Sequence, residues 1–70
     1  MLKRASVISS NIEEVKYDTD SHELHVVFKS GATYIYKDVS DIEFLNFTTA
    51  KSVGAYFNAS IKNNYAYERA

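Results

Sequence analysis

Alternating apolar and polar positions predict three consecutive β-strands in the first half of the chain. In the segment from Ile12 to Asp18, Val15 and Tyr17 alternate with charged residues, which is the pattern of a half-buried strand. The segments 23–28 and 33–39 also read as strands, and a cluster of turn-forming residues separates the first two strands. We therefore expect these three strands to form an antiparallel meander.

The loop between the second and third strands predicts how they pair. A three-residue loop that ends at Gly31 pairs Val26 with Tyr34 and gathers the strongest apolar side chains on one face of the sheet. Glycine suits the last loop position, which requires a positive φ. The same register places Glu23 opposite Lys37 on the other face, where the two charges attract each other.

A helix is expected directly after the strands. Ser40 and Glu43 have the spacing of a capping box, in which the serine hydroxyl accepts from the amide of the glutamate and the carboxylate reaches back. We expect this helix to bury Ile42, Leu45 and Phe44. It should end near residues 48–49.

A second helix is expected from about Ser52 to Lys62. Its apolar stripe repeats every four residues and consists of Val53, Phe57 and Ile61. Gly54 costs about 1 kcal/mol relative to alanine inside a helix, so we expect the helix backbone to pass close to the sheet there, or else close to a ligand, unless the helix begins later than Ser52. Ser52 would cap the helix, with the first amides free to face an anion.

This order of elements predicts an α+β fold, a three-stranded antiparallel meander followed by two helices packed on one sheet face. Seventy residues are too few for two domains, so we expect a single domain over residues 1–70 with an ordered core of about 6–69. The predicted core consists of Val15, Tyr17, Leu24, Val26, Phe28, Tyr34, Tyr36, Val39, Leu45, Val53, Phe57 and Ile61.

Composition and charge narrow the classes of function. The net charge of −1 at pH 7 argues against a charge-driven nucleic-acid binder and against a reader of DNA sequence. The chain has no cysteine, so disulfides and thiolate metal sites are excluded. Because no apolar run approaches the ~18 residues of a membrane span and the first residues lack a signal-peptide core, we expect a cytoplasmic protein that does not bind membranes.

No catalytic or metal-binding constellation is found in the sequence. His22 and His25 have an H-x-x-H spacing, but they fall in a predicted turn and on a predicted strand, where this spacing does not bring two ligands together. No serine lies in a G-x-S-x-G turn, and two glycines are too few for a phosphate-binding loop. We therefore expect no enzyme activity, no catalytic residue, no metal and no cofactor.

Several stretches, spread over nearly the whole chain, resemble one known family. They are Ser9–Ile12 with Tyr17, then Phe28–Val39, Lys51–Lys62 and Tyr65–Arg69. Together they resemble the KTSC domain, which occurs at the C-terminus of some lysyl-tRNA synthetases and as small stand-alone proteins. The central feature of that family is a Tyr-x-Tyr pair, here Tyr34 and Tyr36, and the predicted register turns both toward the core.

The resemblance implies a small binding module of the KTSC type, and the attachment of the domain to a tRNA synthetase suggests RNA as its ligand. The tail of this chain departs from the family pattern. Related tails are basic and carry a proline between two tyrosines, whereas this chain has Asn63, Asn64 and Ala66 at these positions. The departure removes cations that would contact phosphates.

The residues that suit RNA binding gather around the predicted second helix and the tail. Binding requires cations for phosphates and exposed aromatic faces for bases, and each stacked base contributes about 1–3 kcal/mol. This predicted surface consists of Lys51, Ser52, Gly54, Tyr56, Lys62, Tyr65, Tyr67 and Arg69, and its ligand would be RNA or a nucleotide-like anion. In the structural alternative, the two tail tyrosines pack against the helices and the lysines are ordinary solvated groups.

The outer face of the predicted sheet leaves a second function open. His25, Val27 and Ile35 make this face more apolar than a solvated face requires, which favours a self-associating protein-interaction module. Scattered surface apolar residues are the alternative interpretation. A third possibility is an oligomer that sequesters a small molecule in pockets between its protomers.

Overall fold

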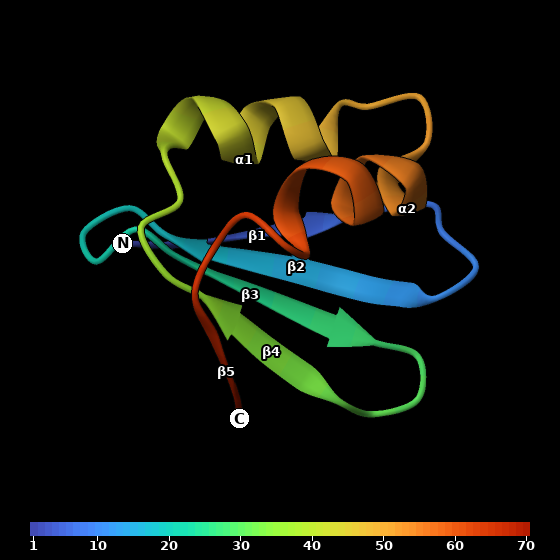
Figure 1. The fold of residues 1–70 in the computed structure, drawn as a ribbon, viewed down its shortest axis with the longest axis horizontal. Helices are drawn as coiled ribbons and strands as arrows, with labels where there is room; N and C mark the ends of the chain where they lie inside the picture. The colour runs from blue at the N-terminus through green and yellow to red at the C-terminus, as the bar shows by residue number, and fades with distance from the viewer.

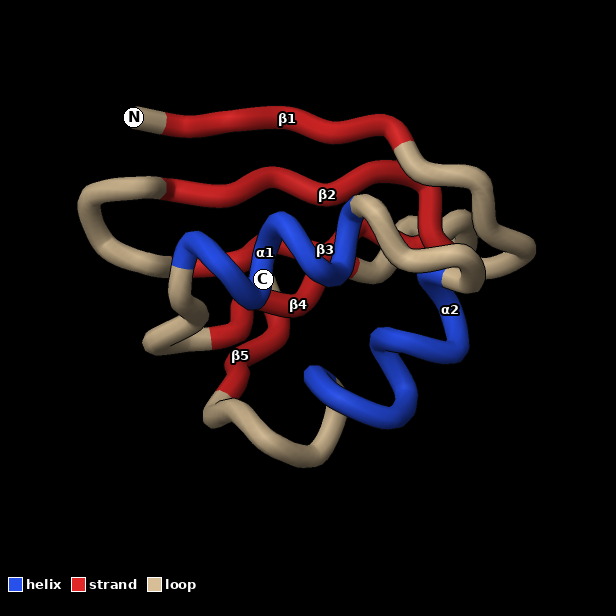
Figure 2. Tube along the Cα trace, turned by 90° about the horizontal axis from the view of Figure 1, so that it is seen from above, coloured by secondary structure: helices blue, strands red, loops and turns tan.

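A computed structural model, which describes residues 1–70, shows a five-stranded antiparallel sheet covered on one face by two helices (Figure 1). The strands lie in chain order across the sheet and are β1 (Leu2–Ser6), β2 (Ile12–Asp18), β3 (Glu23–Phe28), β4 (Thr33–Tyr36) and β5 (Tyr67–Arg69). The helices are α1 (Asp41–Thr48) and α2 (Val53–Tyr56), and α2 continues into a π-helical segment, η1 (Phe57–Ile61). Figure 2, seen from the helical side, shows β1 along one edge of the sheet and the helical segments in front of the sheet.

The predicted α+β class and the two helices are confirmed, but the predicted three-stranded sheet is wrong because the sheet has five strands. β1 pairs with β2 from Leu2 opposite Asp18 to Ser6 opposite Glu14, and the short β5 pairs with β4. Both additional strands are sheet edges, and nearly all of their residues are exposed. Because an edge strand can be polar on both faces, neither one shows the apolar alternation that identified the other three.

The pairing of β3 with β4 confirms the predicted register. Val26 lies opposite Tyr34, and Gly31 in the loop has a φ of 97°. On the outer face, Nζ of Lys37 is 2.6 Å from Oε2 of Glu23. β4 ends at Tyr36, earlier than the predicted end of the strand at residue 39.

Helix α1 packs differently from the prediction. It buries Phe47 completely, whereas Leu45 is 59% exposed and Ile42 is 71% exposed, so the placement of these two residues in the core was wrong. Phe44 and Phe47, three residues apart, lie on the inner side, where the ring of Phe44 stacks on Tyr17 with centroids 4.7 Å apart. The helix carries apolar residues on both sides, and the larger aromatic pair provides more area for burial.

The buried core otherwise follows the predicted pattern. Eleven side chains form it, namely Ile12, Val15, Tyr17, Leu24, Val26, Tyr36, Val39, Phe47, Val53, Phe57 and Ile61. Phe28 and Tyr34, which were expected in the core, are partly buried and pack against it. Neither α1 nor α2 has the length and apolar character that a membrane crossing requires.

The second helical segment follows its predicted bounds closely. Oγ of Ser52 accepts from the amide of Ala55 at 3.2 Å, as expected for a cap. The expected close approach at Gly54 is not found, because a Cβ added there would meet only Oγ of Ser9, at an ordinary contact distance of 3.7 Å. The glycine is therefore not required by packing.

Replacing Gly54 by alanine should stabilise the protein by about 0.5–1 kcal/mol, because alanine favours the helix over glycine and the added methyl group has space. Urea unfolding followed by circular dichroism measures this change in the free energy of unfolding. A destabilised variant would mean that the backbone at this position needs the freedom of glycine.

Candidate functional site

A hollow opens where the β4–β5 edge of the sheet meets the end of η1. It has a volume of about 260 Å³. Its lining consists of five aromatic side chains, one cation and one amide, namely Phe28, Tyr34, Tyr36, Phe57, Tyr67, Lys62 and Asn63. We call this hollow the aromatic pocket.

The five aromatic side chains form a closed ring of contacts. Each ring lies 5.4–5.6 Å, centroid to centroid, from the next, in the order Phe28, Tyr34, Tyr67, Tyr36 and Phe57, which contacts Phe28 again. Four of these contacts are edge-to-face, and the Tyr36–Tyr67 pair is tilted by 36°. Such edge-to-face and tilted pairs are favourable, so the wall of the pocket is held in shape by its own members.

The pocket has a buried floor and an exposed rim. Tyr36 and Phe57 are buried, whereas Tyr67 is 57% exposed. Burial also raises the pKa of Tyr36 above the usual value of a tyrosine, so its hydroxyl stays protonated at neutral pH. A flat aromatic guest would therefore contact protein rings while remaining connected to solvent at the rim.

Two cations lie at the pocket. Lys62 lines it from the end of η1, and the guanidinium carbon of Arg69 lies 5.9 Å from the ring centroid of Tyr34, within cation–π range. No carboxylate is among the lining residues. The pocket therefore combines aromatic walls with positive charge, although the whole chain has a net charge of −1.

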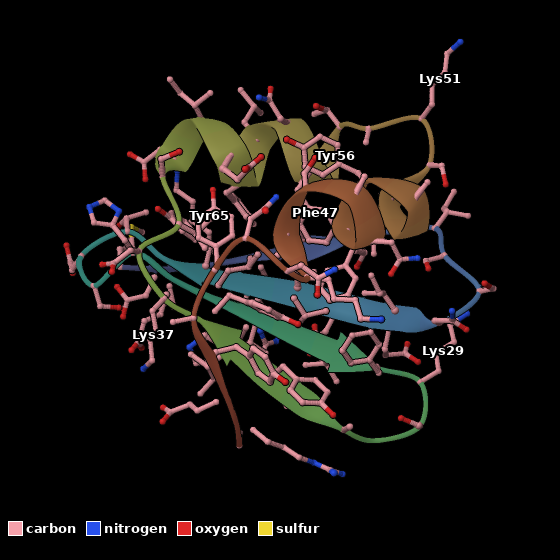
Figure 3. The ribbon with its side chains drawn as sticks, viewed as in Figure 1. Lys29, Lys37, Phe47, Lys51, Tyr56 and Tyr65 are labelled. Carbon is pink, nitrogen blue, oxygen red and sulfur yellow. The ribbon has the colours of Figure 1, made fainter.

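The predicted stacking residues Tyr56 and Tyr65 have a different role. Both hydroxyls donate to the carboxylate of Glu43 on α1, the Tyr65 hydroxyl to Oε1 at 2.8 Å and the Tyr56 hydroxyl to Oε2. Burial, followed by this hydrogen bond, raises the pKa of Tyr65 to about 12. Figure 3 shows both tyrosines beside the helices, where they join α1, α2 and the tail.

Glu43 thus forms only half of the predicted capping box. Its amide donates to Oγ of Ser40 at 3.1 Å, as predicted, but its carboxylate binds the two tyrosines instead of reaching back. Because Tyr65 lies just before β5, this contact holds the tail where it enters the sheet. Tyr67, two residues later, is thereby positioned at the rim of the aromatic pocket.

Six of the eight predicted binding residues do not line the aromatic pocket. Besides Tyr56 and Tyr65, and besides Arg69 next to the Tyr34 ring, three lie elsewhere. Lys51 is exposed in the loop between the helices and points away from the sheet (Figure 3). Ser52 caps α2, and Gly54 lies against Ser9. Of the eight predicted residues, the structure brings only Lys62, Tyr67 and Arg69 together at this pocket.

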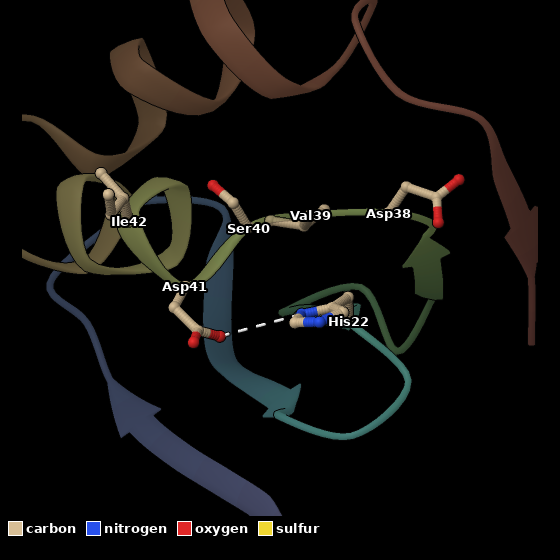
Figure 4. A pocket seen from close by; sticks show the side chains of 6 residues that line it. All are labelled: His22, Asp38, Val39, Ser40, Asp41 and Ile42. Carbon is tan, nitrogen blue, oxygen red and sulfur yellow. Dashed lines mark ion pairs between the residues drawn. The ribbon is translucent and has the colours of Figure 1, made fainter.

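A second hollow lies at the start of α1 and has a volume of about 480 Å³ (Figure 4). It is lined by His22, Asp38, Val39, Ser40, Asp41 and Ile42. We call it the acidic pocket, because two carboxylates line it. The imidazole of His22 lies beside one of them, with Nδ1 3.8 Å from Oδ1 of Asp41. The charge of the acidic pocket makes it unsuited to a phosphate.

The hydrogen bonds at the acidic pocket assign the tautomer of His22. The Tyr17 hydroxyl donates its single proton to the carbonyl of Val39, and its oxygen lies 2.8 Å from Nδ1 of His22. Nδ1 must therefore carry a proton and donate to the tyrosine. Burial raises the pKa of Tyr17 to about 12, and the contact with this hydroxyl connects His22 in the turn to the core.

The outer sheet face carries the residues of the predicted interface. His25 lies opposite Ile35, and Val27 is the next outward residue on β3. All three are partly buried, and the Glu23–Lys37 ion pair lies beside them at 2.6 Å, which lowers the pKa of Glu23. Self-association through this face stays a prediction.

Sequence reasoning missed most of the pocket wall. Phe28, Tyr34, Tyr36 and Phe57 were predicted as core, and Asn63 was noted as a departure from the basic family tail, so none was assigned to a site. The predicted register of β3 and β4 could have indicated them. It places the aromatic side chains of Tyr34 and Tyr36 on the same face of the sheet.

Comparison with known proteins gives three consistent similarities. The KTSC domain profile matches residues 8–65. The crystal structure of a KTSC domain protein from Yersinia pestis superimposes with a TM-score of 0.93 at 31% identity, covering 100% of this chain and 99% of that one. An uncharacterized protein from Stutzerimonas stutzeri (strain A1501) is 35% identical over 69 residues, which is 97% of each chain.

Proposed function

The chain belongs to the KTSC domain family, and on this premise we propose that it is a small non-enzymatic binding module that holds RNA, or a nucleotide-like anion, in the aromatic pocket. The observation that carries the proposal is the ring of five aromatic side chains around an open hollow with Lys62 in its lining. Aromatic walls bind the faces of nucleobases, and a cation at the rim neutralises a phosphate.

The charge of the lining favours a nucleotide over the other guest that aromatic pockets accept. Aromatic cages also bind quaternary ammonium groups through cation–π attraction. Here Lys62 lines the hollow, Arg69 lies beside the ring of Tyr34 and no carboxylate is among the lining residues, so a cationic guest would be repelled. A flat group attached to an anion satisfies both the rings and the cations.

The charge distribution of the molecule supports the same choice of pocket. Asp38 and Asp41 line the acidic pocket at the start of α1, whereas the aromatic pocket is lined by a cation and no acid. An RNA phosphate is therefore attracted to one hollow and repelled by the other.

Reversing the charge of Lys62 tests the proposal. Lys62→Glu should weaken the binding of single-stranded decaadenylate roughly fivefold to tenfold in 50 mM salt, about 1–1.4 kcal/mol, because a phosphate contact becomes a repulsion. Fluorescence anisotropy with a labelled oligonucleotide measures the affinity.

The matched control is Lys51→Glu, which makes the same change of net charge at an exposed loop position outside the pocket. It should change the affinity no more than about twofold, because screening weakens a distant charge. Equal losses in the two variants would show that net charge governs binding and would remove the aromatic pocket from consideration.

A further inference from the structure

We infer that the aromatic pocket takes one unpaired base of single-stranded RNA, and that Lys62 and Arg69 bind the two phosphates on either side of that nucleotide. The inference rests on the proposed function and makes it specific in three respects. It states how many bases enter the pocket, how many phosphates are bound and that the strand is unpaired.

The size of the pocket suits a single base. The open hollow of about 260 Å³ is lined by the five aromatic side chains, which contact one another in one ring. Its floor, formed by Tyr36 and Phe57, is buried, so a guest must enter through the rim. A base inside a duplex would have to leave its pair and its stack to do so, which costs a few kcal/mol in nucleic acids generally.

Two cations approach the pocket from different elements. Lys62 directly follows η1, on the helical side. Arg69 ends β5 and lies opposite Tyr34 in the register, with its guanidinium beside that ring. A nucleotide whose base is in the pocket presents one phosphate on its 5′ side and one on its 3′ side, and each of the two cations would bind one of them.

Acidic groups mark two surfaces outside the aromatic pocket. The acidic pocket contains Asp38 and Asp41, and on the outer sheet face Lys37 is already bound by Glu23 and Glu68, at 2.6 and 3.1 Å. A duplex is held mainly by many phosphate contacts. The inferred site uses two cations, Lys62 and Arg69, so its affinity should depend on the base and only weakly on salt.

The salt dependence of the binding constant reports how many RNA phosphates the protein contacts. The probe is triadenylate without terminal phosphates, which has one phosphate on each side of its middle nucleotide. Each contact to a single strand contributes about −0.7 to the slope of log K against log salt, so the wild-type slope should be about −1.4. Lys62→Gln and Arg69→Gln should each reduce it to about −0.7, and Lys51→Gln should leave it unchanged.

Removing the base tests what fills the pocket. A triadenylate analogue that lacks the middle base should bind roughly 5- to 100-fold more weakly, the range expected for one stacked base. Decaadenylate should bind with a slope similar to that of triadenylate. The same decamer annealed to its complement should bind more weakly than the single strand.

The outcomes separate this inference from the proposed function. If decaadenylate does not bind at all in 50 mM salt, the proposed function fails and the inference fails with it. If decaadenylate binds but the slope is steeper than about −3, or the duplex or the base-deficient probe binds equally well, the protein binds RNA through its phosphates and only the one-base inference is overturned. The one-base inference is also overturned if Lys62→Gln and Arg69→Gln leave the salt slope unchanged.

Discussion

Replacing Phe47 by alanine should lower the free energy of unfolding by about 3–5 kcal/mol, the usual cost of removing a buried phenylalanine. Phe47 is completely buried on the inner side of α1 and contacts the rings of Tyr56 and Phe57. A domain of this size has a total stability of only about 4–10 kcal/mol, so the variant should be largely unfolded in low urea. Urea unfolding followed by circular dichroism measures the loss, and the milder Phe47→Leu variant gives a value if Phe47→Ala does not fold.

Leu45→Ala is the matched control on the same helix. Leu45 is 59% exposed, so its truncation should change the free energy of unfolding by no more than about 0.5 kcal/mol. The comparison also tests which side of α1 faces the sheet. A larger loss for Leu45→Ala than for Phe47→Leu would contradict the observed orientation of the helix.

Replacing Glu43 by alanine should cost about 1.5–3 kcal/mol, because its carboxylate accepts hydrogen bonds from both Tyr56 and Tyr65 and bonds to a charged group contribute this much. The loss should also release the segment that leads into β5. In the same variant, the affinity for single-stranded RNA should therefore fall although Glu43 does not line the aromatic pocket. Glu13→Ala, at an exposed position in β2, removes the same charge and should change neither quantity.

The pH dependence of stability provides a second check on the Glu43 contact. The pKa of Tyr65 is raised to about 12 in the folded protein, above the value of about 10 expected in the unfolded chain. Folding favours the protonated form of Tyr65, so its contribution to the free energy of unfolding is complete below pH 10. That contribution is lost as the pH rises toward 12. The loss between pH 10 and 12 should be smaller in Glu43→Ala than in the wild type. An identical loss in both proteins would mean that Glu43 does not hold the tyrosine.

The sequence predicted the central part of the fold because that part obeys simple apolar periodicity. β2, β3 and β4 each bury one face, and Gly31 fixes the hairpin that aligns β3 with β4. The edge strands β1 and β5 could not be predicted because they bury almost nothing and are defined by pairing with their neighbours. Helix α1 was misassigned because it carries apolar residues on both sides, so its periodicity alone does not select the buried one.

The candidate site could be predicted only in part, for a related reason. Lys62, Tyr67 and Arg69 were grouped by their position in the chain, and the structure places Lys62 and Tyr67 in the pocket lining and Arg69 beside Tyr34. The rest of the wall comes from residues that read as core, because a pocket floor and a core have the same apolar pattern. The role of Glu43 depends on a contact with Tyr65, 22 positions along the chain, which a local motif does not indicate.

The most direct test of the aromatic pocket is a map of where RNA binds. We would titrate the ¹⁵N-labelled protein with decaadenylate and follow the backbone amide signals by NMR. The structure predicts that the shifted signals cluster at Phe28, Tyr34, Lys62, Asn63 and Tyr67, while those of the acidic pocket and of Lys51 stay in place. Saturable shifts centred on His22 and Asp41, or on His25, Val27 and Ile35 of the outer sheet face, would contradict the account, as would a titration that shifts no signal.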